Sequence, residues 1–198
     1  MIRLFTHFIL LSFSLSAAAS DDTLTKPVES KLKNINACLI QQKNSSGEFT
    51  QKKFITILDT PIVTSGHFKS DENASFTWHQ TSPIDVRYIL DNNQLYRVNQ
   101  QGSQEALTLS GKQIEFTLIN TLIKATLGEF DVISNQFSIQ VKNNQCNWSL
   151  TLKPLDKNIS SMIENIIISG NQSIKQINIH EVSGDRTEIL LTQAPGKQ

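Results

Sequence analysis

Apolar and polar residues alternate in at least four short runs between Gly47 and Val98. Clusters of turn-forming residues separate the runs at Asp59-Thr60-Pro61, Asp71-Glu72-Asn73, Ser82-Pro83 and Asp91-Asn92-Asn93. Alternating runs with turns at intervals of about 8–12 residues are typical of antiparallel strands. This stretch therefore predicts a meander in which consecutive strands pair with each other.

One face of this meander is predicted to be largely aromatic. The large apolar residues at alternating positions in the runs are Phe49, Phe68, Phe76, Trp78, Tyr88 and Leu90. Because successive side chains of a strand point to opposite faces of the sheet, most of these residues should share one face. Other parts of the chain must cover such a surface.

In two segments, apolar residues recur with the period of a helix instead of alternating with polar ones. From Pro27 to about Gln42, apolar residues recur at steps of three and four, which predicts an amphipathic helix that can cover part of the sheet. The segment from Gly111 to Phe130 is apolar around most of its circumference, with Leu118 and Leu122 among its apolar positions. A helix of this kind is buried on two sides or lies across a cavity, and Gly128 is a natural stop signal.

The second half of the chain returns to alternation. Five further runs cover residues 137–141, 148–152, 163–168, 174–179 and 187–191, and Trp148 and Leu150 are among the large apolar residues of the second run. Together with the meander they predict roughly ten strands and two main helices, without an internal repeat.

Residues 1–19 have the features of a secretory signal peptide. Arg3 supplies the positive charge, residues 8–15 form a short apolar core, and Ala17-Ala18-Ala19 forms a cleavage site of small residues. The apolar core is too short to span a bilayer, and no cysteine near the cleavage site could be lipidated. We therefore expect a single mature domain at 20–198 that is soluble, not lipidated and located outside the cytoplasm.

The charge balance disfavours two classes of partner. Lys plus Arg and Asp plus Glu both number 18, so removal of Arg3 with the signal peptide leaves a net charge close to −1. Without a basic patch, the chain lacks the electrostatic footprint of a nucleic-acid-binding protein and a polybasic anchor for anionic lipid.

The sequence contains no pattern that supports catalysis, a metal or a cofactor. His67, His79 and His180 lie on three different strands, where we expect them to face solvent, and no local pair of metal ligands accompanies them. Motifs for an activated serine or for a phosphate-binding loop are also missing. The acidic pairs Asp21-Asp22 and Asp71-Glu72 fall in segments where solvated carboxylates are the default.

Cys38 and Cys146 are the only two cysteines. In an oxidising compartment they could form a disulfide that joins the first helix to the sheet and closes a loop of about 107 residues. The chain-entropy model gives such a loop about 4–5 kcal/mol of stabilisation. Two buried free thiols fit the sequence almost as well, so both states stay open.

The aromatic face also has two interpretations. It could be ordinary core beneath the helices, or the sheet and helices could leave an apolar cavity between them that admits a lipid.

Several short motifs resemble those of the LolA-like outer-membrane lipoprotein carriers in their order and spacing. They are Gly47-Glu48-Phe49-Thr50-Gln51-Lys52, Gly66-His67-Phe68, Phe76-Thr77-Trp78 with the following Ser82-Pro83, Asn93-Gln94-Leu95-Tyr96, and Gly184-Asp185-Arg186-Thr187-Glu188-Ile189. The resemblance covers nearly the whole mature chain.

This resemblance implies a fold, a location and a function. The fold would be mainly β, a curved and incompletely closed antiparallel β-barrel of about 10–11 strands with covering helices. The protein would be a periplasmic monomer, without enzymatic activity, that takes acyl chains from an inner-membrane transporter and delivers them to an outer-membrane acceptor. The cavity wall would be formed by Phe49, Phe68, Phe76, Trp78, Tyr88, Leu90, Leu118, Leu122, Trp148 and Leu150.

The chain departs from the carrier pattern in two places. Where the carriers have Arg-Pro before the strand with the tryptophan, this chain has Asp71-Glu72-Asn73, and it ends at Gln198 soon after the last predicted strand. Its second half is more similar to a divergent branch that accompanies lipid or polyene synthesis and export, which implies a glycolipid or another lipid-like cargo instead of a lipoprotein.

Two other functions remain open from the sequence. One is a non-carrying module that docks on an export complex of the cell envelope and has a filled core. The other, an enzyme acting on a lipid, lacks any apparent nucleophile and base.

Overall fold

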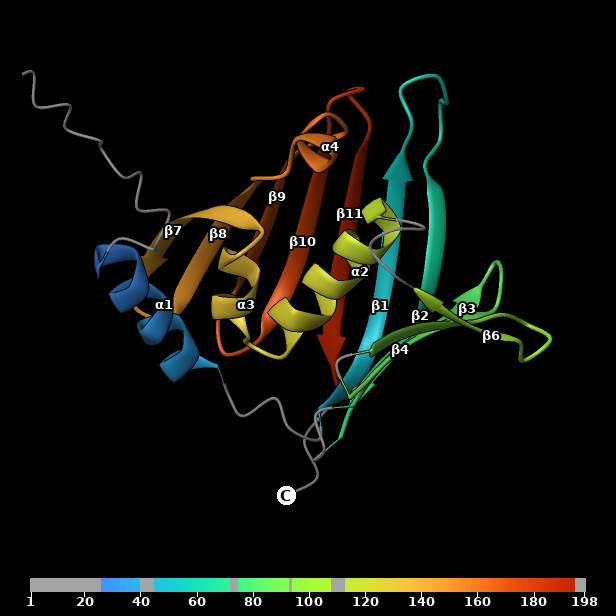
Figure 1. Ribbon diagram of the computed structural model, residues 1–198, viewed down its shortest axis with the longest axis horizontal. Coiled ribbons are helices and arrows are strands. Elements are labelled where there is room, and N and C mark those ends of the chain that lie inside the picture. The colour runs from blue at the N-terminus through green and yellow to red at the C-terminus, as the bar shows by residue number, and fades with distance from the viewer. Residues whose placement is uncertain (1–25, 40–44, 72–74, 93, 108–112, 195–198) are drawn as a thin grey trace, which may run out of the picture.

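The computed structural model describes residues 26–39, 45–71, 75–92, 94–107 and 113–194. The expected signal peptide lies outside these residues. The described part forms an open antiparallel sheet of eleven strands with four helices, as Figure 1 shows. Among the described helices, none combines the length and the apolar character that crossing a membrane requires.

The first half of the chain forms one meander and the second half another. The first comprises β1 (Ser46–Phe54), β2 (Ile62–Ser70), β3 (Phe76–Ser82), β4 (Val86–Asp91), β5 (Gln94–Val98) and β6 (Gln104–Leu107). The second comprises β7 (Phe137–Asn144), β8 (Asn147–Pro154), β9 (Ile163–Gly170), β10 (Ile174–Glu181) and β11 (Arg186–Gln193). The strand order β6-β5-β4-β3-β2-β1-β11-β10-β9-β8-β7 confirms the predicted pairing of consecutive strands. Strand β6, with the sequence Gln-Glu-Ala-Leu, was not predicted because it is too short to show a period.

The strand register places large apolar side chains on one face of the sheet. Phe76 is paired with Leu90, and Trp78 with Tyr88, so the predicted aromatic set does share a face. We call this the inner face, because α2 (Gln113–Thr126) runs across it over β10, β11 and β1 (Figure 1). Close packing on this face requires Gly47, since a Cβ atom there would collide with the ring of Phe68 and the carbonyl oxygen of Thr192.

The helices differ from the prediction at their ends. Helix α1 (Lys26–Cys38) stops before Gln42. Helix α2 stops at Thr126, two residues before the predicted stop signal Gly128, and the rest of the apolar segment differs from the prediction because Phe130 begins a separate helix, α3 (Phe130–Ser134). Gly128 has a φ of +75°, a left-handed conformation that favours glycine and ends α2 as expected. The short helix α4 (Lys157–Ser160) had no signal in the apolar pattern.

A disulfide between Cys38 and Cys146 connects the end of α1 to the turn between β7 and β8. The two Cα atoms are 5.4 Å apart. Leu32 and Ile35 of α1 are buried in the core, so α1 covers the β7 end of the sheet through both packing and a covalent bond.

The turn between β1 and β2 is bonded to the turn between β10 and β11. The carboxylate of Asp185 accepts hydrogen bonds from the backbone N–H of Thr56 at 2.9 Å and from its hydroxyl at 2.8 Å. The backbone bond is the main cause that lowers the pKa of Asp185 below its ordinary value, and the hydroxyl bond and the nearby Lys53 add to it.

We expect removal of the disulfide by Cys38→Ser with Cys146→Ser to lower the free energy of unfolding by about 2–4 kcal/mol, because the loop that it closes spans 108 positions. Urea denaturation of the oxidised wild type and the double variant measures the difference. The reduced wild type serves as the control and should match the variant. Equal stability of the oxidised and reduced wild type would contradict the prediction.

The lowered pKa of Asp185 predicts a specific pH dependence. A carboxylate with a depressed pKa stabilises the fold above its unfolded value, and this contribution disappears as the pH falls through the folded pKa. Asp185→Asn should therefore be less stable than the wild type at pH 7, and the difference should shrink below about pH 4. Urea midpoints across this range test the prediction, and a constant difference would contradict it.

Candidate functional site

A cavity of about 340 Å³ lies between α2 and the inner face of the sheet. Three apolar side chains of α2 form one wall and side chains of β1, β3, β10 and β11 form the other. The residues that line the cavity are Gln51, Lys53, Trp78, Leu118, Ile119, Leu122, Ile179, Glu181, Thr187 and Ile189.

The apolar end of the cavity rests on stacked aromatic rings. Trp78 is only 3% exposed, and its ring stacks on that of Phe49 with 3.9 Å between the centroids. The ring of Phe68 stacks beside Trp78 at 6.2 Å. These rings have few alternative positions in a packed interior, so they form a rigid floor for an apolar guest.

The other end of the cavity is polar. The ammonium group of Lys53 lies 2.6 Å from the carboxylate of Glu181, and their side chains are 35% and 23% exposed. Gln51 and Thr187 also line this end. On β2, Thr64 lies directly across from Gln51 of β1. The hydroxyl of Thr64 is buried and has no hydrogen-bond partner within the described structure.

The structure brings three of the ten predicted wall residues, Trp78, Leu118 and Leu122, together at this cavity. Phe49 lies directly behind Trp78 in the aromatic stack. Phe68, Phe76 and Leu90 belong to the buried core of the same face, and Tyr88 packs against that core in a half-buried position.

Trp148 and Leu150 lie elsewhere on the sheet. Both are buried on β8, where the ring of Phe130 meets that of Trp148 edge to face at 6.1 Å. The indole N–H of Trp148 donates a hydrogen bond of 2.7 Å to the carbonyl oxygen of Asn171. Above β8, α3 fills the space over the sheet. Trp148 and Leu150 therefore do not line the cavity under α2.

Sequence reasoning missed the polar end of the cavity. Lys53 follows Phe49 at a distance of four residues, so strict alternation already places it on the inner face. Its partner Glu181 was not identifiable, because the two residues meet only after β11 has inserted between β1 and β10. Ile179 and Ile189 were assigned to strands, but the pattern did not show which face of each strand meets α2.

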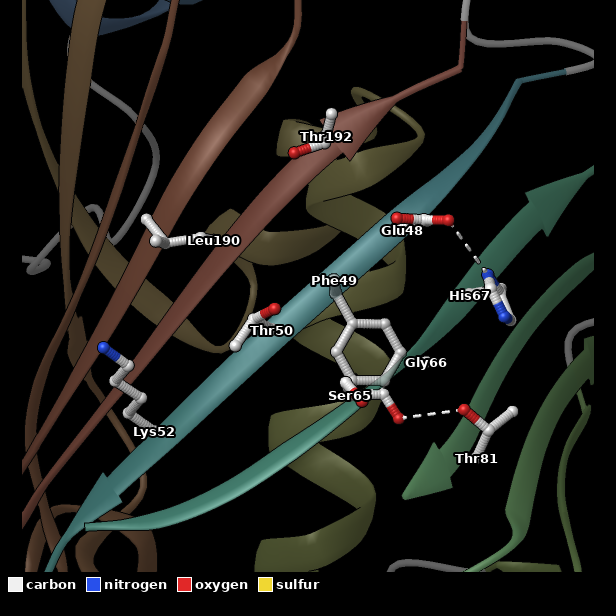
Figure 2. Close-up of a pocket in the computed structure, with 10 residues that line it drawn as sticks. All are labelled: Glu48, Phe49, Thr50, Lys52, Ser65, Gly66, His67, Thr81, Leu190 and Thr192. Atoms are coloured by element: carbon white, nitrogen blue, oxygen red, sulfur yellow. Dashed lines mark hydrogen bonds and ion pairs between the residues drawn. The ribbon is translucent and has the colours of Figure 1, made fainter. Parts of the chain in front are cut away.

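A second hollow of about 450 Å³ lies on the opposite face of the sheet. Figure 2 shows its side chains on β11, β1, β2 and β3, with the helices behind the sheet. Most of them are polar, including Glu48, whose carboxylate lies 4.0 Å from His67. An apolar guest would bury less apolar surface here than under α2, so the smaller hollow is the better candidate site.

The three strand histidines also lie on this outer face. His67 is exposed, while His79 is half-buried and approaches Asp85 at 3.1 Å. In the part of the chain that the structure describes, no three His, Cys, Asp or Glu side chains are grouped so that they could hold a metal ion.

The amino-acid sequence also matches a protein family. Residues 41–198 match the family described as "Outer membrane lipoprotein carrier protein LolA". Since this match covers most of the chain, the protein belongs to the LolA family, which confirms the resemblance seen in the sequence. LolA-like proteins are periplasmic carriers or binders of lipidated cargo and are not enzymes.

Comparison with solved structures gives matches of low similarity. A LolA superfamily protein from Nitrosomonas europaea has a TM-score of 0.45 at 10% identity, over 86% of this chain and 94% of that chain. A DUF1329 family protein from Desulfovibrio piger has a TM-score of 0.48 at 10% identity, over 85% and 92%. A putative outer membrane lipoprotein-sorting protein domain from Vibrio parahaemolyticus has 0.46 at 8% identity, over 85% and 93%. Comparison with curated proteins gives no match.

The unpaired hydroxyl of Thr64 predicts a stabilising substitution. A buried hydroxyl without a partner costs about 1–3 kcal/mol, and valine has a similar shape without the polar atom. Thr64→Val should therefore raise the free energy of unfolding by about 1 kcal/mol in urea denaturation. The control Thr50→Val, at an exposed position of β1, should change it by no more than about 0.5 kcal/mol. Destabilisation by Thr64→Val would contradict the prediction.

Proposed function

We propose that this protein is a periplasmic carrier that shields an acyl chain of a lipoprotein or another lipidated cargo in the cavity under α2. The observation that supports this function best is the cavity itself, with an aromatic floor and an apolar helix above it. Membership of the LolA family supports the same function independently of the cavity.

The size of the cavity sets the amount of cargo that it can hold in the described conformation. A methylene group occupies about as much space as a water molecule, about 30 Å³, so 340 Å³ accommodates about eleven carbon atoms of one chain. Lipids with several long chains would require α2 to move away from the sheet. The half-buried positions of Leu118 and Ile119 are consistent with a helix that covers the cavity without being locked into a closed core.

The estimated binding free energy of an acyl chain is suitable for a carrier. Burial of about eleven methylene groups at about 0.8 kcal/mol each gives about 9 kcal/mol, which corresponds to a dissociation constant near or below 1 µM. This affinity keeps an acyl chain out of water, but an acceptor that buries more of the chain can remove it. Delivery from an inner-membrane transporter to an outer-membrane acceptor would then need only a gradient of affinity.

The first test is native mass spectrometry of the full chain after expression and purification from a bacterial periplasm. We expect bound masses that match lipids or acylated polypeptides. If neither such masses nor binding of an added fluorescent monoacylglycerol is found, the carrier function is wrong, and a module that docks on an envelope complex replaces it.

A charge introduced into the cavity should abolish binding. Ile119→Glu places a carboxylate against the apolar wall, where its desolvation is unfavourable, so we expect the affinity for a fluorescent monoacylglycerol to fall by tenfold or more. The matched control is Val132→Glu, which introduces the same charge at a 40% exposed position on α3. Equal binding by both variants would place the binding site somewhere other than under α2.

A further inference from the structure

On the basis of the carrier function, we infer that the polar end of the cavity selects cargo with an uncharged head group that forms hydrogen bonds, and discriminates against anionic head groups. Lys53 and Glu181, the charged residues among the described residues that line the cavity, neutralise each other there. An acyl chain that lies along the apolar wall would place its head group beside this pair.

An anionic head group would lose more than it gains at this position. To reach the ammonium group of Lys53 it must displace the carboxylate of Glu181 from a separation of 2.6 Å, or approach that carboxylate as a like charge. A second carboxylate, that of Asp185, is also near enough to Lys53 for the lysine to lower its pKa. The surroundings of Lys53 therefore have no excess positive charge to offer an anion.

A neutral head group finds suitable partners in the same place. The amide of Gln51 and the hydroxyl of Thr187 line the cavity, and each can both donate and accept hydrogen bonds. Head groups that carry hydroxyl or amide groups, such as those of acylglycerols, glycolipids and acylated peptides, fit this set of partners.

Two amphiphiles with the same chain test the inference. Dodecanoylglycerol is neutral and dodecanoate is anionic at pH 7.5, and their shared chain matches the estimated capacity of about eleven carbon atoms. We expect the wild-type protein to bind dodecanoylglycerol at least tenfold more tightly than dodecanoate. Calorimetric titrations below the critical micelle concentration of each amphiphile measure the two affinities. Equal affinities, or tighter binding of dodecanoate, would overturn the inference and leave the carrier function intact. If neither amphiphile binds, the carrier function fails and this inference fails with it.

Substitution of the acidic partner should reverse the discrimination. Glu181→Gln removes the ion-pair partner of Lys53, so we expect binding of dodecanoate to strengthen by about fivefold or more and that of dodecanoylglycerol to change by less than about twofold. The double variant Lys53→Gln with Glu181→Gln is neutral again and should retain the wild-type preference for dodecanoylglycerol. An unchanged ratio of affinities in Glu181→Gln would overturn the inference.

Glu188→Gln is the matched control for a change in overall charge. Glu188 lies on β11, pairs with Arg186 at 3.2 Å, and faces away from the cavity. This variant removes the same charge as Glu181→Gln, so it should leave the ratio of the two affinities unchanged. Urea denaturation of every variant distinguishes a change in selectivity from a loss of folded protein. A shift in the ratio of the two affinities for Glu188→Gln would also contradict the inference.

Discussion

The antiparallel pairing of β1 with β11 is the interaction on which the rest of the structure depends. It extends over eight positions, from Gly47 with Gln193 to Phe54 with Arg186, and in the described sheet it is the only strand pairing between the first meander and the second. Each meander alone would expose an apolar face and an unpaired edge. The pairing joins the two faces into one surface large enough for α2 to lie across, and it places Phe49 opposite Leu191 and Lys53 opposite Thr187.

The same inner face is a filled core at one end and a cavity at the other. Toward β7 and β8, large side chains from α1 and α3 reach down to the sheet, and the ring of Phe130 packs edge to face on that of Trp148. Toward β1, the inner positions after Phe49 are Gln51 and Lys53, and β11 contributes the small Thr187. Polar and small residues cannot fill the space beneath an apolar helix, so a cavity remains there.

This arrangement separates the two requirements of a carrier. The aromatic stack behind Trp78 is rigid and needs no rearrangement to receive an acyl chain, while only α2 separates the chain from solvent on the other side. Because the apolar wall supplies most of the proposed affinity and the Lys53 and Glu181 pair contributes little net charge, chain length and head group can be recognised by different parts of the site. In the proposed carrier, a single cavity would therefore bind tightly enough to transport cargo and still distinguish between cargoes.

The sequence by itself determined both meanders, the inner position of the aromatic residues, the stop of α2 near Gly128 and the family, because each of these depends on local periods or on short motifs. Only the tertiary structure decided what meets across the sheet. Lys53 and Glu181 are 128 positions apart and approach each other through the register of β1, β11 and β10, and Cys38 reaches Cys146 through the packing of α1 on β7. Local alternation assigns a face to each residue of a strand, but it contains no information about the partner strand or about which part of a face a helix will fill. Of the ten residues predicted for one cavity wall, Trp78, Leu118 and Leu122 line the cavity under α2, and distant contacts decided which of the ten belong to the cavity and which to the core.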